Sequence, residues 1–306
     1  MNKILLIASL IMFVSLSSCH SLVEDEFDNF SHIPVMNSLL QADSTFRVQV
    51  TLTANLTDST PVYVTNAQVI IENSLDAPDT LIYTQKGWYV SSRIVKAGVS
   101  YSCKVNIPNF PQISAQTTVP EPTGIDSVVF TDLAGRGKEG EKISSVEFYV
   151  KNNPAQKRFW EVILVTEGLI TEYNFETNAF EEHYGIRKEE IYMISGQDPV
   201  LLNEANPLSL FSNKLMTKNA YKVKFYINEG YTKLNGGRIP YIELRSVDES
   251  YYKYVKQYYI YESASEINIG QSSQHYPLYS NIKNGIGLFT GISASRKELL
   301  RSSEGK

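Results

Sequence analysis

Short runs in which apolar and polar side chains alternate are the feature that most constrains the fold of this chain. The clearest early run covers residues 46–52, where one face carries Phe46, Val48, Val50 and Leu52. Successive side chains of a β-strand point to opposite faces, so this run has one apolar and one wet face. Similar runs cover 67–71, 101–107 and 221–227, and turn residues such as Gly87 and Gly98 lie between the early ones. Strands of this length and spacing predict a mainly β protein.

A proline-rich segment, Val119-Pro120-Glu121-Pro122-Thr123-Gly124, marks the predicted boundary between two domains. Prolines hold their neighbours extended, and the glycine ends the stiff stretch. Residues 34–122 are predicted to form an immunoglobulin-like or carboxypeptidase-regulatory-like β-sandwich. Residues 123–296 are predicted to form a second, larger β-rich domain, and residues 297–306 a polar tail.

One helix is predicted in the second domain, over residues 247–262. Ser246 and Glu249 have the spacing of a capping box, in which two side chains satisfy the first free N–H groups of a helix. Tyr251, Val255 and Tyr258 then follow at roughly helical spacing, and the face that carries them is predicted to pack on the core.

Two further tyrosines of this helix, Tyr252 and Tyr259, share another side and are the candidate ligand-binding residues. Their flat rings offer surfaces to a sugar ring or a peptide. The alternative is that they pack at the edge of the core with their hydroxyls in water.

The start of the chain has the pattern of a bacterial lipoprotein signal. Lys3 precedes an apolar run of 13 residues, and Leu16-Ser17-Ser18 leads directly to Cys19. A membrane-spanning helix needs about 20 residues, so this run is too short to cross a bilayer. The pattern predicts a signal peptide over residues 1–18, cleavage between Ser18 and Cys19, and lipid on the Cys19 thiol. The alternatives are an ordinary secretory signal cut near Ser18 and a buried strand.

Residues 19–33 are predicted to be an acidic, flexible tether, because Glu24, Asp25, Glu26 and Asp28 stand close together without periodicity. A triacylated cysteine, carrying palmitate-type chains, would hold the protein firmly on a membrane, since two or more chains anchor stably. The acidic stretch resembles a surface-export signal of Bacteroidetes lipoproteins. We therefore expect a lipid anchor in the outer membrane facing the cell surface, with a periplasm-facing anchor as the alternative.

The sequence shows no catalytic constellation. The four histidines, His20, His32, His183 and His275, lack metal-ligand spacing, so we expect no metal, no cofactor and no enzymatic activity. A net charge of −5 without a basic stripe argues against nucleic-acid binding. Once Cys19 is acylated, Cys103 is the only other thiol, and its place in an alternating run predicts a buried, unreactive side chain.

Several motifs together resemble a known family. The lipobox is followed by Gly87-Trp88-Tyr89, by Gly98-Val99-Ser100-Tyr101, by the Val119-Pro120 hinge, and by a closing segment from Asn281-Ile282 to Phe289. In this order they resemble the Bacteroidetes outer-membrane lipoproteins of domain of unknown function 4249, over nearly the whole mature chain. The resemblance implies an envelope protein often encoded beside TonB-dependent transporters, with no catalytic residues to carry over.

Three hypotheses follow for the function. The leading one is a non-enzymatic accessory or binding lipoprotein that works beside a TonB-dependent outer-membrane transporter in nutrient uptake. The second is an adhesive or structural surface protein. The third is a hydrolase whose scattered carboxylates meet only in the folded chain, which spacing alone does not reveal.

Overall fold

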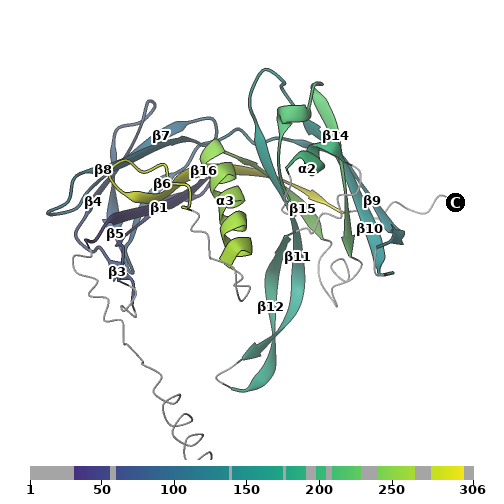
Figure 1. Ribbon diagram of the computed structural model, residues 1–306, viewed down its shortest axis with the longest axis horizontal. Coiled ribbons are helices and arrows are strands. Elements are labelled where there is room, and N and C mark those ends of the chain that lie inside the picture. Colours follow the sequence, from purple (N-terminus) through teal and green to yellow (C-terminus); the bar gives the residue numbers. More distant parts are fainter. Residues whose placement is uncertain are drawn as a thin grey trace, which may run out of the picture. The chain divides into compact units, whose positions relative to one another are not determined.

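A computed structural model describes residues 31–55, 60–137, 140–174, 177–190, 198–204, 209–228, 240–265 and 277–299. The chain divides into two compact units, Met1–His32 and Ile33–Lys306. The predicted signal peptide, Ser18 and Cys19 lie outside the described residues. The second unit is mainly β, as the alternating runs predicted (Figure 1).

The first half of the unit is built from eight strands. They are β1 (Pro34–Gln41), β2 (Thr45–Leu52), β3 (Val62–Tyr63), β4 (Gln68–Asn73), β5 (Asp79–Tyr83), β6 (Trp88–Ile94), β7 (Ser100–Asn106) and β8 (Ile113–Thr118). Their order is β1-β2-β6-β5-β4-β7-β8, with β3 on β2. Because β5 pairs with both β6 and β4, it forms the corner where the sheet passes from one layer to the other.

Alternation places the apolar residues of both layers in one core. Phe46 of β2 meets Tyr101 of β7 edge to face, with ring centroids 5.1 Å apart. Cys103 is fully buried in this core, and burial raises the pKa of its thiol to about 12. The predictions of a sandwich-like first half and of an unreactive Cys103 thus agree with the structure.

The second half contains a small sheet that faces a larger one. The small sheet has the order β14-β10-β9, and the larger includes β12, β11, β15 and part of the last strand, with β13 on β11. The core between them is lined by Phe148, Trp160, Phe225 and Leu244. The bounds of the elements are β9 (Ile125–Arg136), β10 (Lys142–Lys151), β11 (Phe159–Asn174), β12 (Ala179–Glu190), α2 (Pro199–Asn203), β13 (Leu210–Ser212), η1 (Asn213–Leu215), β14 (Ala220–Asn228) and β15 (Tyr241–Val247).

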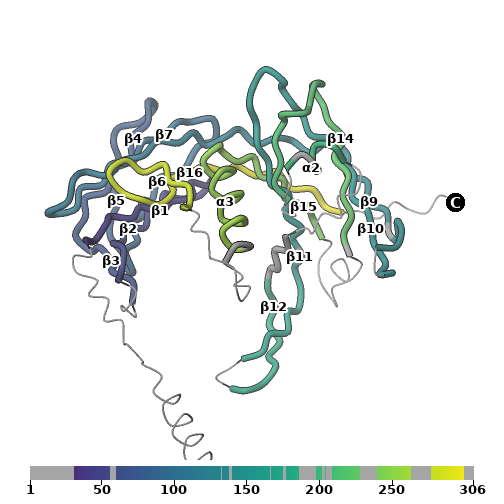
Figure 2. The backbone as a smooth tube through the Cα atoms, viewed as in Figure 1, coloured from purple at the N-terminus to yellow at the C-terminus, as the bar shows by residue number. Residues whose placement is uncertain are grey.

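The last strand, β16 (Ile286–Glu298), belongs to both halves. Its first part runs parallel to β1, with Val35 opposite Ile286, and its second part runs antiparallel to β15, with Val247 opposite Ile292. Figure 2 shows this strand in yellow, passing from one half to the other. We predicted that residues 123–296 form a separate domain; the structure instead places Phe289 in the core of the first half. One continuous strand therefore joins the two cores.

The glycines that precede and open β16 allow close backbone contact. Gly287 has φ +118, and a Cβ atom there would lie 2.2 Å from the Met36 carbonyl oxygen. Glycine adopts this backbone conformation without the penalty that other residues face. The predicted turn feeding a buried final strand is confirmed, since Phe289 is fully buried.

The predicted helix is present as α3 (Glu249–Ser265), but its start differs from the prediction. Asp248 is the N-cap, because its carboxylate accepts the Tyr251 N–H at 2.8 Å. Ser246 lies within β15 and does not cap the helix. On the helix, Tyr251, Tyr252 and Val255 pack on the sheet, whereas Tyr258 is 40% exposed. The predicted core role of Tyr258 is therefore wrong, and Tyr252 takes that place.

We predict that Gly287→Ala destabilises the unit by about 2 kcal/mol or more, because the methyl group meets the β1 backbone at a positive φ. Gly124→Ala is the matched control, since no heavy atom lies within 4 Å of its Cβ position. Urea unfolding followed by circular dichroism measures both. Equal midpoints for the two variants would contradict the close approach of β1 and β16.

Candidate functional site

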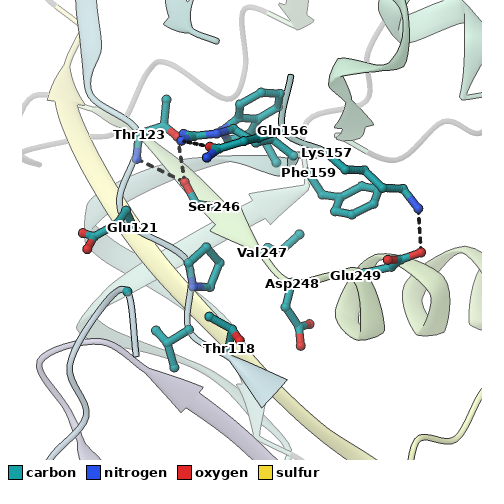
Figure 3. Close-up of a pocket in the computed structure, with 15 residues that line it drawn as sticks. Thr118, Glu121, Thr123, Gln156, Lys157, Phe159, Ser246, Val247, Asp248 and Glu249 are labelled. Atoms are coloured by element: carbon teal, nitrogen blue, oxygen red, sulfur yellow. Dashed lines mark hydrogen bonds and ion pairs between the residues drawn. The ribbon is translucent and has the colours of Figure 1, made fainter. Parts of the chain in front are cut away.

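A cavity of about 530 Å³ lies where the two halves meet. Four chain segments line it, namely the turn before β7, the end of β8 with the hinge that follows, the loop that enters β11, and the junction of β15 with α3 (Figure 3). The lining residues are Gly98, Thr118, Val119, Pro120, Glu121, Thr123, Gln156, Lys157, Arg158, Phe159, Trp160, Ser246, Val247, Asp248 and Glu249.

Hydrogen bonds connect Thr123 of the hinge to β11 and β15 of the second half. The Trp160 indole N–H donates to the Thr123 hydroxyl oxygen at 2.9 Å, and the Ser246 hydroxyl donates to the same oxygen at 3.0 Å. The Thr123 backbone N–H in turn donates to the Ser246 oxygen at 3.1 Å. These buried polar groups therefore satisfy one another, as Figure 3 shows.

The remaining wall has an apolar part and a polar part that includes Glu121, Gln156 and Arg158. Phe159 and Val247 belong to the small core beneath α3, and both line the cavity. At the edge, the Lys157 ammonium lies 2.6 Å from the Glu249 carboxylate and 5.3 Å from the centre of the Phe159 ring. Lys157 and Lys253 hold the pKa of Glu249 below its usual value, so this edge carries a fixed ion pair.

Asp248 connects three elements beside the cavity. Its carboxylate accepts hydrogen bonds from the hydroxyls of Thr117 on β8 and Thr290 on β16, in addition to capping α3. Burial raises the pKa of Asp248, and these hydrogen bonds offset part of the rise. The carboxylate is thus engaged in holding the sandwich, the last strand and the helix together.

A second cluster of charges lies on the face of the sheet that α3 covers. Glu243 is buried and binds the guanidinium groups of Arg245 at 2.7 Å and Arg296 at 2.9 Å. Arg245 also binds Glu161 at 2.9 Å, and Glu161 accepts the Tyr251 hydroxyl at 3.0 Å. Burial acts to raise the pKa of Glu243, but the two arginines outweigh it and hold that pKa below its usual value. Glu161, Glu243, Arg245 and Arg296, called here the Glu243 ladder, thus form a set of ion pairs in which each carboxylate is paired with at least one arginine.

The first candidate residue, Tyr252, faces the protein. Its hydroxyl donates to the buried Glu204 carboxylate, and its ring lies 4.3 Å from the ring of Phe159. Burial acts to raise the pKa of Glu204, yet hydrogen bonds from Tyr252, Lys256 and Ser212 outweigh it and lower that pKa. Tyr252 also lines a smaller cavity of about 300 Å³ next to Lys157 and Glu249.

The second candidate residue, Tyr259, is half-buried on the same helix. The tyrosines of α3 whose rings stack are Tyr254 and Tyr258, with centroids 6.0 Å apart. A ligand-binding role for Tyr252 and Tyr259 stays a prediction.

Sequence reasoning missed Asp248 and Glu243. The signal for Asp248 was available, because aspartate is a favoured N-cap residue and stands directly before the helix. Glu243 stands within the run Tyr241-Ile242-Glu243-Leu244-Arg245, and its burial follows from α3 covering that face. No spacing rule places a helix there.

Among the residues that the structure describes, no helix combines the length and apolar character needed to cross a bilayer. The same part of the chain contains no group of three or more His, Cys, Asp or Glu side chains arranged to hold a metal ion.

The fold and the cavity define a mainly β protein in which two sandwich-like halves share their last strand. The chain belongs to the family of the domain of unknown function DUF4249, whose model matches residues 22–298. This match confirms the family expected from the sequence motifs. No curated protein matched the sequence in the corresponding comparison.

We predict that the Glu243 ladder makes stability dependent on pH. Because its folded pKa is below the ordinary value of 4.5, Glu243 contributes stability above that value, and the contribution is lost as pH falls through the folded pKa. The free energy of unfolding of Glu243→Gln should therefore fall less steeply between pH 5 and pH 3, a window set by acid pKa values of roughly 4.

Urea titrations across this window, on the wild type and the variant, measure the slope. Glu298→Gln serves as the control, because this carboxylate is exposed at the end of β16. If the Glu243→Gln slope matched that of the wild type, the buried ladder would not be the source of the acid sensitivity.

Proposed function

We propose that this protein is a lipid-anchored, non-enzymatic binding component of the cell envelope that works beside a TonB-dependent outer-membrane transporter in nutrient uptake. The observation that carries the binding role is the cavity at the junction of the two halves. Its volume of about 530 Å³ is within the range of small-molecule sites.

Several polar side chains in the cavity are already hydrogen-bonded to other groups of the protein, which favours binding over catalysis. Thr123, Ser246 and Trp160 bond to one another, and Asp248 is occupied by two threonine hydroxyls and a helix N-terminus. What remains for a ligand is an apolar wall that includes Phe159, the side chains of Glu121, Gln156 and Arg158, and an ion pair at the edge. Such a wall suits an apolar or aromatic group that carries a charged or polar substituent.

The anchor and the partner are supported by the sequence. Leu16-Ser17-Ser18-Cys19 has the form of a lipobox, and the acidic residues that follow resemble a surface-export signal. Membership of the DUF4249 family supports the association with a transporter through the resemblance described above. In this proposal the anchor holds the protein at the membrane that a captured nutrient must cross.

Replacing the anchoring thiol tests the location. We predict that Cys19→Ala moves the protein from the membrane fraction to the supernatant, because no acyl chain is attached. Cys103→Ala is the matched control, since Cys103 is fully buried and its loss leaves the anchor intact. Fractionation of intact cells followed by mass spectrometry of the first tryptic peptide measures both. A Cys19→Ala chain that still sediments with outer membranes would overturn the anchor.

Filling the cavity tests the binding role. We predict that Thr118→Trp, at the exposed end of β8 on the cavity wall, impairs nutrient uptake that depends on this gene. Gln116→Trp is the control, because it adds the same side chain to an exposed position two residues earlier on the same strand. The measurement is growth of a deletion strain complemented with each variant. Full complementation by Thr118→Trp would contradict a role for this cavity.

A further inference from the structure

The outer part of the β11–β12 hairpin is a two-stranded ribbon. β15 pairs with β11 only as far as Val165, which lies opposite Tyr241. From residue 166 outward, to 174 on β11 and from 177 to 187 on β12, the two strands pair only with each other among the described strands (Figure 1). A lone pair of strands is marginally stable in water, so this ribbon gains most from an added partner.

One face of the ribbon carries four large, exposed side chains, with the Thr171–Glu182 pair between them. Leu169 lies opposite Tyr184, and Tyr173 lies opposite Phe180. The alternation of a strand puts all four on one face, and the Tyr173 and Phe180 rings meet edge to face with centroids 5.1 Å apart. Phe180 is 74% exposed, Tyr184 56% and Leu169 50%. A patch of large side chains this exposed marks an interaction surface.

The free edge of the ribbon fits a strand. β12 is the terminal strand of the 13-stranded sheet, so the outward backbone groups of residues 179–185 form an edge to which another strand can add. Gly168 lies opposite Gly185 at the inner end of the ribbon. Glycines within strands weaken them and permit bending, so the ribbon can adjust to what it meets.

The charge of the ribbon selects among possible occupants. Residues 166–187 include five glutamates and one arginine, Arg187, which lies opposite Thr166 at the inner end of the ribbon. Glu181 accepts a hydrogen bond from the Thr177 hydroxyl at 2.7 Å, and its pKa lies below the usual value because of bonds from Thr177 and Asn174. These carboxylates repel an anionic bilayer surface and attract a basic chain.

We propose that the β11–β12 ribbon binds an extended segment of a partner protein in which apolar and basic residues alternate, added as a strand along β12. The apolar side chains cover Phe180 and Tyr184, and the basic ones lie on the opposite face, where β12 carries Glu181. The inference concerns residues 166–187 and does not require the lipid anchor.

The probe is a fluorescein-labelled peptide of about nine residues that alternates valine with lysine, long enough to match an average strand. Fluorescence anisotropy with the purified full chain measures its binding. The matched control peptide alternates valine with glutamate. We expect the basic peptide to bind at least about tenfold more tightly than the acidic one, and less tightly at high salt.

Protein variants locate the site. Phe180→Ser with Tyr184→Ser, and separately Glu181→Lys with Glu182→Lys, should each weaken basic-peptide binding by about tenfold or more. Ile82→Ser is the control, because this apolar residue of β5 is 72% exposed but lies outside the ribbon. Circular dichroism verifies that every variant is folded.

Equal binding of the two peptides, or full binding by both ribbon variants, would overturn the proposal. So would association of the chain with itself, or with anionic vesicles, that is lost in the Phe180→Ser and Tyr184→Ser variant. The Cys19→Ala chain should bind the peptide as the wild type does, so the outcome is independent of the anchor and of its test.

Discussion

The parallel pairing of β1 with the first part of β16 is the contact on which the rest of the structure depends. It places Phe289 in the first core, while the same strand continues to β15 and puts Ile292 beneath α3. Because the strand is continuous, neither core can open without disturbing the other. Asp248 adds a polar connection at the same junction, joining α3 to β8 and β16.

The buried carboxylates of the second half are each balanced by basic or hydrogen-bonding partners. Glu243 forms ion pairs with two arginines, and Glu204 accepts hydrogen bonds from Tyr252, Lys256 and Ser212. A buried charge is tolerated when its partners replace the water that it has lost. These groups hold α3 on the sheet, and they leave the apolar wall of the neighbouring cavity as the surface available to a ligand.

Local patterns predicted local structure well. Alternation placed the strands at 46–52, 101–107 and 221–227, because burial of one face depends only on side-chain period. The parallel partner of β1 could not be found in this way, since Leu288 and Asn37, which hydrogen-bond there, are 251 positions apart. The helix start was misplaced for a different reason. Ser246 has the capping-box spacing to Glu249, but its hydroxyl donates to the Thr123 hydroxyl oxygen instead of capping the helix.

The position of β16 in the sheet has a consequence for how the nascent chain matures. The chain emerges from the ribosome amino end first, so β1 is made long before the strand that completes its edge. Contacts this distant in sequence form slowly, and an unpaired apolar strand attracts wrong partners in the meantime. A product cut short before Ile286 would leave β1 without its parallel partner and β15 without its antiparallel one, so both halves would remain incomplete.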